Sequence, residues 1–401
     1  NMAADENDTV VLRAAENTWA CRFKAGGGDP TATAKYGVPP GTEAMLAAPG
    51  EEYSPEWYDA ATPPDPAKME SFLKNLPVNK WVQATEGGRK RSSYAFCTIA
   101  MDPDRDQLIV WAGGHSTKHS TEVTRYSLAT GRWHIDYSPQ LAMCYGRILW
   151  GKAYAYGYRS WMPRHLWGSY GYDTVSKRML TFKNTDPVSL LFNPDAGDFD
   201  LPVAQPFSGQ RQAGQVCATP KGLVAWVVEG LFLFEAEKRA WRKLAVKGGK
   251  LPPTGDDRAR VEYDSKRGQL LFLSAPYSGK FNGKVHAYNL ASGEMKTLVP
   301  KNREMVANFR FLRELRYVPS ADMLFDMMGL SYDLKTNKWM RLKIDRTAFQ
   351  RLYRRKTPPG GANSSQGLAY DPKRDLLWAV NGYSNTKAVL VMKLDAEKAG
   401  K

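Results

Sequence analysis

Residues 104–137 read DRDQLIVWAGGHSTKHSTEVTRYSLATGRWHIDY, and this stretch decides the fold. An apolar run from Leu108 to Ala112 ends in a Gly113-Gly114 pair, and a polar loop follows. A second strand-like run, Glu122 to Leu128, enters a tight turn, and Trp133 opens a third strand just beyond it. Short strands separated by turn signals predict all-β structure.

The same pattern returns along the chain with a period of about 45 to 55 residues. The turns after successive first strands read AMDPDRDQL, GYDTVSKRML, EYDSKRGQL, YVPSADML and AYDPKRDLL. A Gly-Gly pair after an apolar strand, a tyrosine on the next strand and a tryptophan past a tight turn resemble the repeat of kelch-type β-propellers. The resemblance implies blades that close into a ring and leave few strand edges exposed.

We therefore expect an all-β, six- or seven-bladed kelch-like propeller with an N-terminal extension. Six clear blades follow from the repeat, and residues 1–78 or 137–168 could supply a degenerate seventh. Trp81 resembles the tryptophan of an outermost strand, so the N-terminal side would complete the last blade. The innermost strands are expected at Ala95–Met101, Gly168–Asp173, Gly214–Thr219, Arg260–Asp264, Leu312–Val318 and Gln366–Asp371.

The first 78 residues do not show the repeat. They contain strand-like runs at Thr9–Ala14 and Trp19–Lys24 and a helical signal at Pro66–Leu76. We interpret residues 1–78 as an extension packed on the propeller and residues 79–401 as the propeller itself, with an independent N-terminal domain as the alternative.

The amino-acid composition indicates what kind of partner the protein would bind. The chain has a net charge of +15, 12 tryptophans and 20 tyrosines. A positive surplus favours an anionic partner, and the aromatic side chains favour a ligand with faces on which to stack. No apolar run is long enough to span a membrane.

The sequence contains few patterns typical of metal sites or disulfide bonds. The four cysteines are widely spaced without a C-x-x-C, so a zinc site is not expected and disulfides are left open. No phosphate-binding, dinucleotide-binding, zinc-protease or serine-hydrolase motif occurs. We expect no required cofactor and no catalytic metal, although a structural divalent metal stays compatible with the sequence. No signal peptide is visible in the chain, which begins Asn1-Met2.

Strand parity then predicts where a site would be built. In a four-stranded blade the connections from strand 2 to 3 and from one blade to the next leave on the same face. The long segments all fall there, and long loops on a rigid face are where sites are built. They are Gly113–Glu122, Tyr137–Gly168, Lys183–Phe199, Lys247–Arg258, Ala275–Lys284, Pro300–Arg310 and Asp345–Gln366.

Arginine precedes five of the six innermost strands. Equivalent positions in a ring face one axis, so these guanidinium groups would circle one mouth and could bind carboxylate, sulfate or phosphate. The structural alternative is that they bond neighbouring loop carbonyls. The positions are Arg91, Arg164, Arg211, Arg258 and Arg310, with Asn363 at the sixth.

An aromatic insertion, MCYGRILWGKAYAYGYRSWMPRHLWGSYGYD, follows the first blade. Tyr156 and Tyr158 would share one strand face, and Trp161 and His165 lie nearby in the sequence. The insertion could be a sugar-stacking and proton-transfer wall or an ordinary outer-blade segment.

Three of the five histidines map to this face. His115 follows the Gly-Gly pair, His119 shares its loop, and His165 lies in the insertion. His134 and His286 fall on outer strands, where a structural role is expected.

Arginine, histidine and tyrosine without paired carboxylates suit β-elimination on a uronate-containing, possibly sulfated polysaccharide. In fold and residue types the chain resembles the propeller-fold polysaccharide lyases of the ulvan lyase kind. The resemblance implies these roles only as residue types. We assign His115 as base or carboxylate partner, Tyr158 as acid/base, and Arg164 or Arg211 as the group that neutralises the carboxylate. Tyr145, Tyr156 and Tyr172 are the alternatives to Tyr158. The expected substrate-binding residues are Arg91, His119, Tyr156, Trp161, His165, Arg258, Arg310 and Asn363.

Two rival functions remain. A non-catalytic propeller could bind an acidic glycan or peptide through the arginine-lined mouth. Nucleic-acid binding is disfavoured because long Lys/Arg runs are missing apart from 351–356. We expect a secreted or periplasmic monomer whose partner is an acidic polysaccharide and not a membrane.

Overall fold

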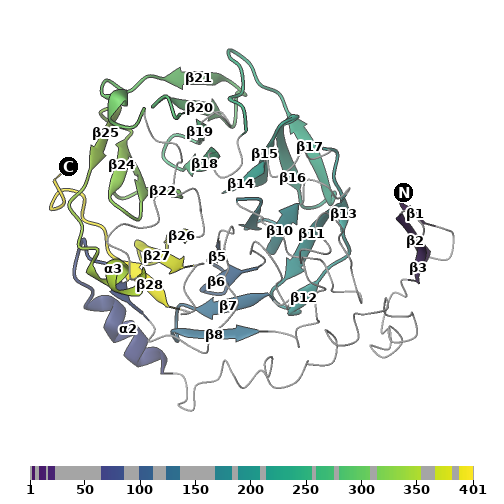
Figure 1. Ribbon diagram of the computed structural model, residues 1–401, viewed down its shortest axis with the longest axis horizontal. Helices are drawn as coiled ribbons and strands as arrows, with labels where there is room; N and C mark the ends of the chain where they lie inside the picture. Colours follow the sequence, from purple (N-terminus) through teal and green to yellow (C-terminus); the bar gives the residue numbers. More distant parts are fainter. Residues whose placement is uncertain are drawn as a thin grey trace.

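The computed structural model describes the backbone of three short N-terminal strands and of eleven further segments, with the side chains of these segments except those of residues 135, 352, 353, 366 and 381. The segments are 65–84, 99–111, 123–135, 168–182, 188–207, 214–254, 259–274, 280–307, 314–353, 366–381 and 388–400. Within the described part, six antiparallel sheets surround one axis, so the protein is an all-β six-bladed propeller (Figure 1). The six innermost strands follow one another around this axis, and the last of them returns to the first.

Each blade is an antiparallel sheet, and in blades 1, 3, 4 and 5 the strands pair in sequence order. Blade 1 holds β5 (Ala100–Asp102), β6 (Gln107–Val110), β7 (Thr124–Ser127) and β8 (Arg132–Ile135). Blade 2 holds β9 (Tyr170–Asp173), β10 (Arg178–Phe182), β11 (Val188–Asn193), β12 (Asp198–Phe199) and β13 (Val203–Ala204). Blade 3 holds β14 (Gly214–Thr219), β15 (Gly222–Val227), β16 (Gly230–Glu235) and β17 (Ala240–Leu244).

The second half of the ring repeats the plan. Blade 4 holds β18 (Ala259–Asp264), β19 (Gln269–Ser274), β20 (Val285–Asn289) and β21 (Met295–Leu298). Blade 5 holds β22 (Leu315–Val318), β23 (Met323–Asp326), β24 (Leu330–Asp333) and β25 (Lys338–Arg341). Blade 6 holds β26 (Gln366–Asp371), β27 (Leu376–Asn381), β28 (Val389–Met392) and β4 (Val82–Gln83).

The sixth blade is completed by the N-terminal side of the propeller, as the position of Trp81 predicted. Strand β4 pairs antiparallel with β28, with Val82 opposite Val391. Trp81 is fully buried and its indole N–H donates to the carbonyl of Met327 at 3.0 Å, which ties the closing segment to blade 5. Ring closure therefore depends on a short segment far in sequence from the strands it joins.

Outer-strand tryptophans seal the blades against one another. The indole of Trp241 donates to Ser189 of blade 2, and that of Trp339 donates to the carbonyl of Gly283 next to blade 4. Each of these side chains is less than one tenth exposed. A buried Trp finds a partner for its N–H while its rings fill the gap between sheets, so this repeat residue explains the regular packing.

The N-terminal region has three strands and a helix in its described part. Strands β1 (Met2–Ala4), β2 (Thr9–Ala14) and β3 (Asn17–Arg22) form an antiparallel sheet. Helix α2 (Pro66–Lys74) is capped by Asp65, whose carboxylate accepts the Lys68 N–H. Met69 and Leu73 join the core that blade 1 shares with blade 6. The assignment of residues 1–78 as one extension remains a prediction, since residues 23–64 lie outside the described part.

Three of the expected long loops contain regular structure. Within 183–199, β11 and β12 supply the outer half of blade 2. Within 345–366 lies helix α3 (Thr347–Tyr353), and a short 3-10 turn, η5 (Arg303–Met305), follows blade 4. No seventh propeller sheet occurs among the described residues, and most of the insertion 137–168 lies outside them.

Candidate functional site

The structure does not place the predicted site residues. They all fall in segments outside the described part of the chain, so the arginine ring and the catalytic assignments stay predictions. The residues concerned are Arg91, His115, His119, Tyr156, Tyr158, Trp161, Arg164, His165, Arg211, Arg258, Arg310 and Asn363.

The described strand ends do define two faces. At the first, which we call the turn face, tight turns join strand 1 to 2 and strand 3 to 4 of the blades. The second face, which we call the connection face, carries two kinds of connection. One joins strand 2 to strand 3 within a blade, and the other joins strand 4 to the innermost strand of the next blade. Each predicted site residue belongs to a segment that joins strand ends of the connection face.

Positive charge in the sequence is concentrated in the segments that join those ends. Residues 354–356 are Arg-Arg-Lys in a segment without a carboxylate, between α3 and β26. Residues 89–91 are Arg-Lys-Arg with a single glutamate nearby, between β4 and β5. Most of the net charge of +15 falls in such segments.

The turn face, by contrast, is fastened by a repeated ion-pair motif. Asp-x-x-Arg follows the innermost strand in blades 1, 4 and 6, and each arginine donates to its own aspartate and to a carboxylate of the next blade around the ring. The bridging pairs are Arg105 with Asp195, Arg267 with Asp322, and Arg374 with Asp106.

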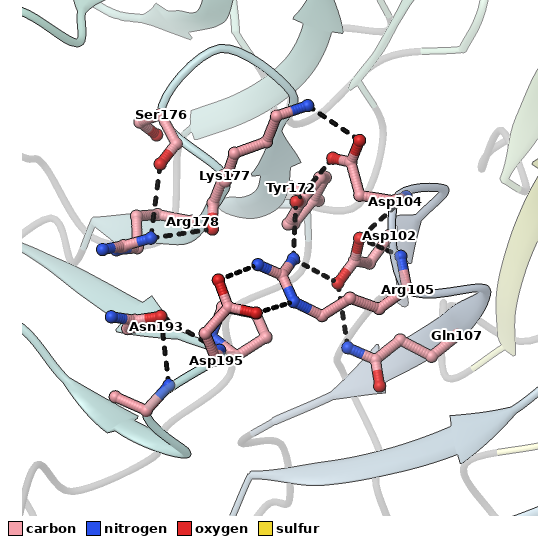
Figure 2. Close-up of polar contacts among 12 residues, drawn as sticks. Asp102, Asp104, Arg105, Gln107, Tyr172, Ser176, Lys177, Arg178, Asn193 and Asp195 are labelled. Carbon is pink, nitrogen blue, oxygen red and sulfur yellow. Dashed lines mark hydrogen bonds and ion pairs between the residues drawn. The ribbon is translucent and has the colours of Figure 1, made fainter.

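Figure 2 shows the densest example, between blades 1 and 2. The Nε of Arg105 donates to Oδ1 of Asp195 at 2.6 Å, and its Nη1 donates to the hydroxyl of Tyr172 at 2.9 Å. That hydroxyl donates to Oδ2 of Asp104 at 2.8 Å, and Lys177 pairs with Oδ1 of the same carboxylate at 2.7 Å. Every aspartate labelled in this view has a cationic partner.

The electrostatics match a structural role. The Arg105 hydrogen bond holds the pKa of Asp195 below its usual range. Burial raises the pKa of Tyr172, and its bond to Asp104 raises it further. Because the motif repeats between blades and its charges are matched, we interpret it as a fastening of the ring.

A second cluster of charged side chains lies near the axis, at a position where two blades carry residues that differ from those of the other blades. The residue two places before the end of each innermost strand is small or apolar in most blades but charged in two. The six residues, in blade order, are Ala100, Gly171, Cys217, Glu262, Arg316 and Ala369. In a repeat protein, a residue that recurs in every repeat usually has a structural role. A position at which one repeat carries a different kind of residue is therefore a candidate for function.

Glu262, Arg316 and Glu314, which we call the axial cluster, connect three innermost strands. Nη1 of Arg316 donates to Oε1 of Glu262 at 2.6 Å, and Nη2 lies 3.6 Å from Oε2 of Glu314. The Glu262 side chain is 13% exposed and that of Arg316 is 19% exposed, so some solvent reaches both. The cluster is therefore a partly accessible group of charges deep in the ring.

Burial dominates the chemistry of the cluster. It raises the pKa of the Glu262 carboxyl, against the opposing charge of Arg316. Burial also raises the pKa of the neighbouring Cys217 thiol, and the Glu262 charge adds to the shift. A carboxyl with a raised pKa beside an arginine is a common composition of functional sites.

Sequence reasoning missed the axial cluster, although a signal was present. Comparison of the six innermost strands at one position separates Glu262 and Arg316 from the alanine and glycine of other blades. The two histidines expected to be structural do have strand partners: His134 contacts Arg125, and His286 contacts Thr297 at 3.0 Å.

Neither a metal centre nor a membrane helix is found in the described segments. No group of three or more His, Cys, Asp or Glu side chains there could hold a metal ion. None of the helices described combines the length and the apolar character needed to cross a bilayer.

Comparison with known proteins assigns no family. No family model matches the chain, and no curated protein matches it. Among solved structures, one similar chain is XC5397 from Xanthomonas campestris, described as a gluconolactonase important in glucose secondary metabolic pathways. It is 9% identical with a TM-score of 0.44, and the match covers 83% of this chain and 96% of that one.

Proposed function

We propose that the protein is a polysaccharide lyase that binds a uronate-containing acidic polysaccharide at the connection face and cleaves it by β-elimination. The placement of charge carries the proposal. The turn-face arginines of the repeated motif are occupied by carboxylates of the protein, whereas the segments at the connection face carry most of the surplus positive charge. A polyanion would therefore be drawn to the connection face.

The chemistry follows from the residue types in those segments. Arg164 or Arg211 would neutralise the uronate carboxylate, which lowers the pKa of the proton at C5. His115 or Tyr158 would remove that proton, and a tyrosine would protonate the departing glycosidic oxygen. Arg91, Arg258, Arg310 and Asn363 would hold neighbouring acidic groups around the mouth.

The remaining assigned residues would bind the sugar rings themselves. Tyr156 and Trp161 offer faces on which a ring can stack, and His119 and His165 offer hydrogen bonds. A polysaccharide substrate of this kind implies a secreted or periplasmic protein. The reaction as written requires no cofactor.

The test is a lyase assay. The protein is incubated with ulvan, heparin, chondroitin sulfate and polygalacturonate, and the ultraviolet absorbance of the unsaturated uronate product is followed. Product from at least one substrate supports the proposal. Binding without product on every substrate supports the rival function, a propeller that recognises an acidic glycan or peptide without cleaving it.

Variants assign the roles once a substrate is found. His115→Ala and Tyr158→Phe are each expected to lower turnover by about a hundredfold or more, the usual scale for acid–base groups. Arg211→Ala should weaken turnover and binding together, because the carboxylate is held in ground and transition states alike.

His134→Ala is the control. Its ring contacts Arg125 between two outer strands, so the substitution should change stability more than rate. Full activity of His115→Ala would show that the site assignment is wrong.

A further inference from the structure

The innermost strands of blades 4, 5 and 6 are joined by side chains of the axial cluster. Glu262 on β18 accepts the backbone N–H of Tyr317 on β22 at 3.2 Å. Glu314, immediately before β22, accepts the backbone N–H of Leu368 on β26 at 2.5 Å, and Nε of Arg316 on β22 donates to the Leu368 carbonyl at 2.6 Å. Two side chains, one on β22 and one immediately before it, thus hold both backbone polar groups of one residue of β26.

Another junction in the ring uses the backbone instead. Between blades 2 and 3, Gly168 forms a parallel bridge with Gln215, and the N–H of Val216 donates to the Gly168 carbonyl at 2.8 Å. Gly168 has no room for a side chain here, because a Cβ would lie 2.0 Å from the Gln215 side chain. Ionisable side chains therefore join the innermost strands of blades 4 to 6, whereas blades 2 and 3 are joined by direct backbone contact.

We propose that Glu262, Arg316 and Glu314 form a proton-sensitive clamp that couples the innermost strands of blades 4, 5 and 6. The clamp is independent of the proposed lyase activity, since it uses none of the residues assigned to that reaction. Glu262 is its titrating group. The groups that face it are the Cys217 thiol from β14, the charge of Arg316 from β22 and the charge of Glu314 immediately before β22.

The direction of the pH effect follows from the environment of Glu262. Burial raises the pKa of this carboxyl above the ordinary value of 4.5, so the folded protein holds its proton more tightly than the unfolded chain does. The contribution of Glu262 to stability is then greatest below pH 4.5 and is lost as the pH rises through the folded-state pKa. Above that pKa, the buried negative charge of the Glu262 carboxylate is compensated by the positive charge of Arg316.

The first experiment compares urea unfolding of the wild type and Glu262→Gln from below pH 4.5 to well above it. Gln imitates the protonated form and keeps an acceptor for the Tyr317 N–H. We expect the variant to gain stability relative to the wild type as the pH rises. Parallel curves would overturn the proposal, and so would a variant that fails to fold, because the neutral form would then be unable to maintain the clamp.

Glu235→Gln is the matched control. Glu235 is a partly exposed carboxyl, with 23% of its side chain accessible, and its pKa is lowered by its hydrogen bonds to Lys238 and Arg242. Its removal should change the pH dependence in the opposite direction or leave it unaltered. The same response in both variants would count against a special role for Glu262.

The second experiment tests the contacts by hydrogen exchange. Glu262→Ala should speed exchange of the Tyr317 amide by about tenfold or more, while Glu262→Gln preserves most of its protection. Glu314→Ala and Glu314→Gln should show the same contrast at the Leu368 amide. If the Ala variants leave both amides as protected as in the wild type, the clamp does not exist.

Discussion

The ion pair between Arg374 and Asp106 joins the sixth blade to the first, where the ring closes. The guanidinium makes two parallel hydrogen bonds to the carboxylate, and the two side chains are 22% and 17% exposed. Because the pair is bidentate and mostly buried, we expect Arg374→Met to lower the free energy of unfolding by about 1–3 kcal/mol. Urea unfolding monitored by tryptophan fluorescence would measure the change.

The control for this variant is Lys398→Met. Lys398 pairs with Asp395 inside the C-terminal segment, and its side chain is 70% exposed. An exposed pair of this kind contributes little, so its loss should leave the urea midpoint unaltered. Equal effects of the two substitutions would contradict a fastening role for the turn-face motif.

The same motif predicts how stability responds to acid. The hydrogen bond from Arg267 lowers the pKa of Asp322 from 3.8 to about 2. The contribution of Asp322 to the free energy of unfolding, about 2 kcal/mol, is therefore present above pH 3.8 and lost as the pH falls toward 2. Asp322→Asn should be less stable than the wild type at neutral pH, and the difference should shrink in acid. A difference that stays constant with pH would show that the charge of Asp322 is not what stabilises the junction.

Among the elements, the segment that closes the ring is held by one large buried side chain. Trp81 is fully buried between blades 5 and 6, and it packs edge-on against Phe349 of α3 with ring centroids 5.3 Å apart. Trp81→Ala should cost about 3–5 kcal/mol, the usual range for a buried aromatic. Denaturant unfolding measures the cost, and Trp339→Ala, at the equivalent position of blade 5, is the matched comparison. A loss below about 1 kcal/mol for Trp81→Ala would mean that β4 does not hold blade 6.

Most elements could be predicted because their signals are local. The repeated turn sequences marked five of the six innermost strands, and Trp81 indicated how the ring closes. Strand β11 was missed because its run VSLLFN lies between Asn-Thr-Asp-Pro and Asn-Pro-Asp-Ala-Gly, which indicate turns on both sides. Helix α3 was missed because it lies inside a long basic segment between blades.

The charged contacts could not be predicted in the same way. Arg105 meets Asp195, and Glu262 meets Arg316, only because the ring brings separate blades together. No spacing within the sequence encodes those distances. The site predicted from arginines, histidines and tyrosines is untested by the described residues. The departure of Glu262 and Arg316 from the repeat is present in the sequence, but their contact became visible only when the strands were placed around one axis.

For the whole molecule, the net charge of +15 predicts salt-sensitive binding. If the connection face binds an acidic polysaccharide, added salt should weaken binding steeply, because it screens the ion pairs and opposes counterion release. Titration calorimetry at several sodium chloride concentrations measures this dependence. Binding that does not respond to salt would indicate a neutral ligand stacked on aromatic side chains.

The central claim is that the connection face, and not the turn face, binds the polyanion. Two variants that each remove three positive charges test it directly by their affinity for an acidic polysaccharide at low salt. One replaces Arg354, Arg355 and Lys356 of the connection face with Gln. The other replaces Lys221, Lys266 and Lys335, which are exposed on turns of the opposite face. We predict that the first weakens binding by about tenfold or more while the second leaves it near the wild-type value. Equal losses in the two variants, or a larger loss in the second, would contradict the account.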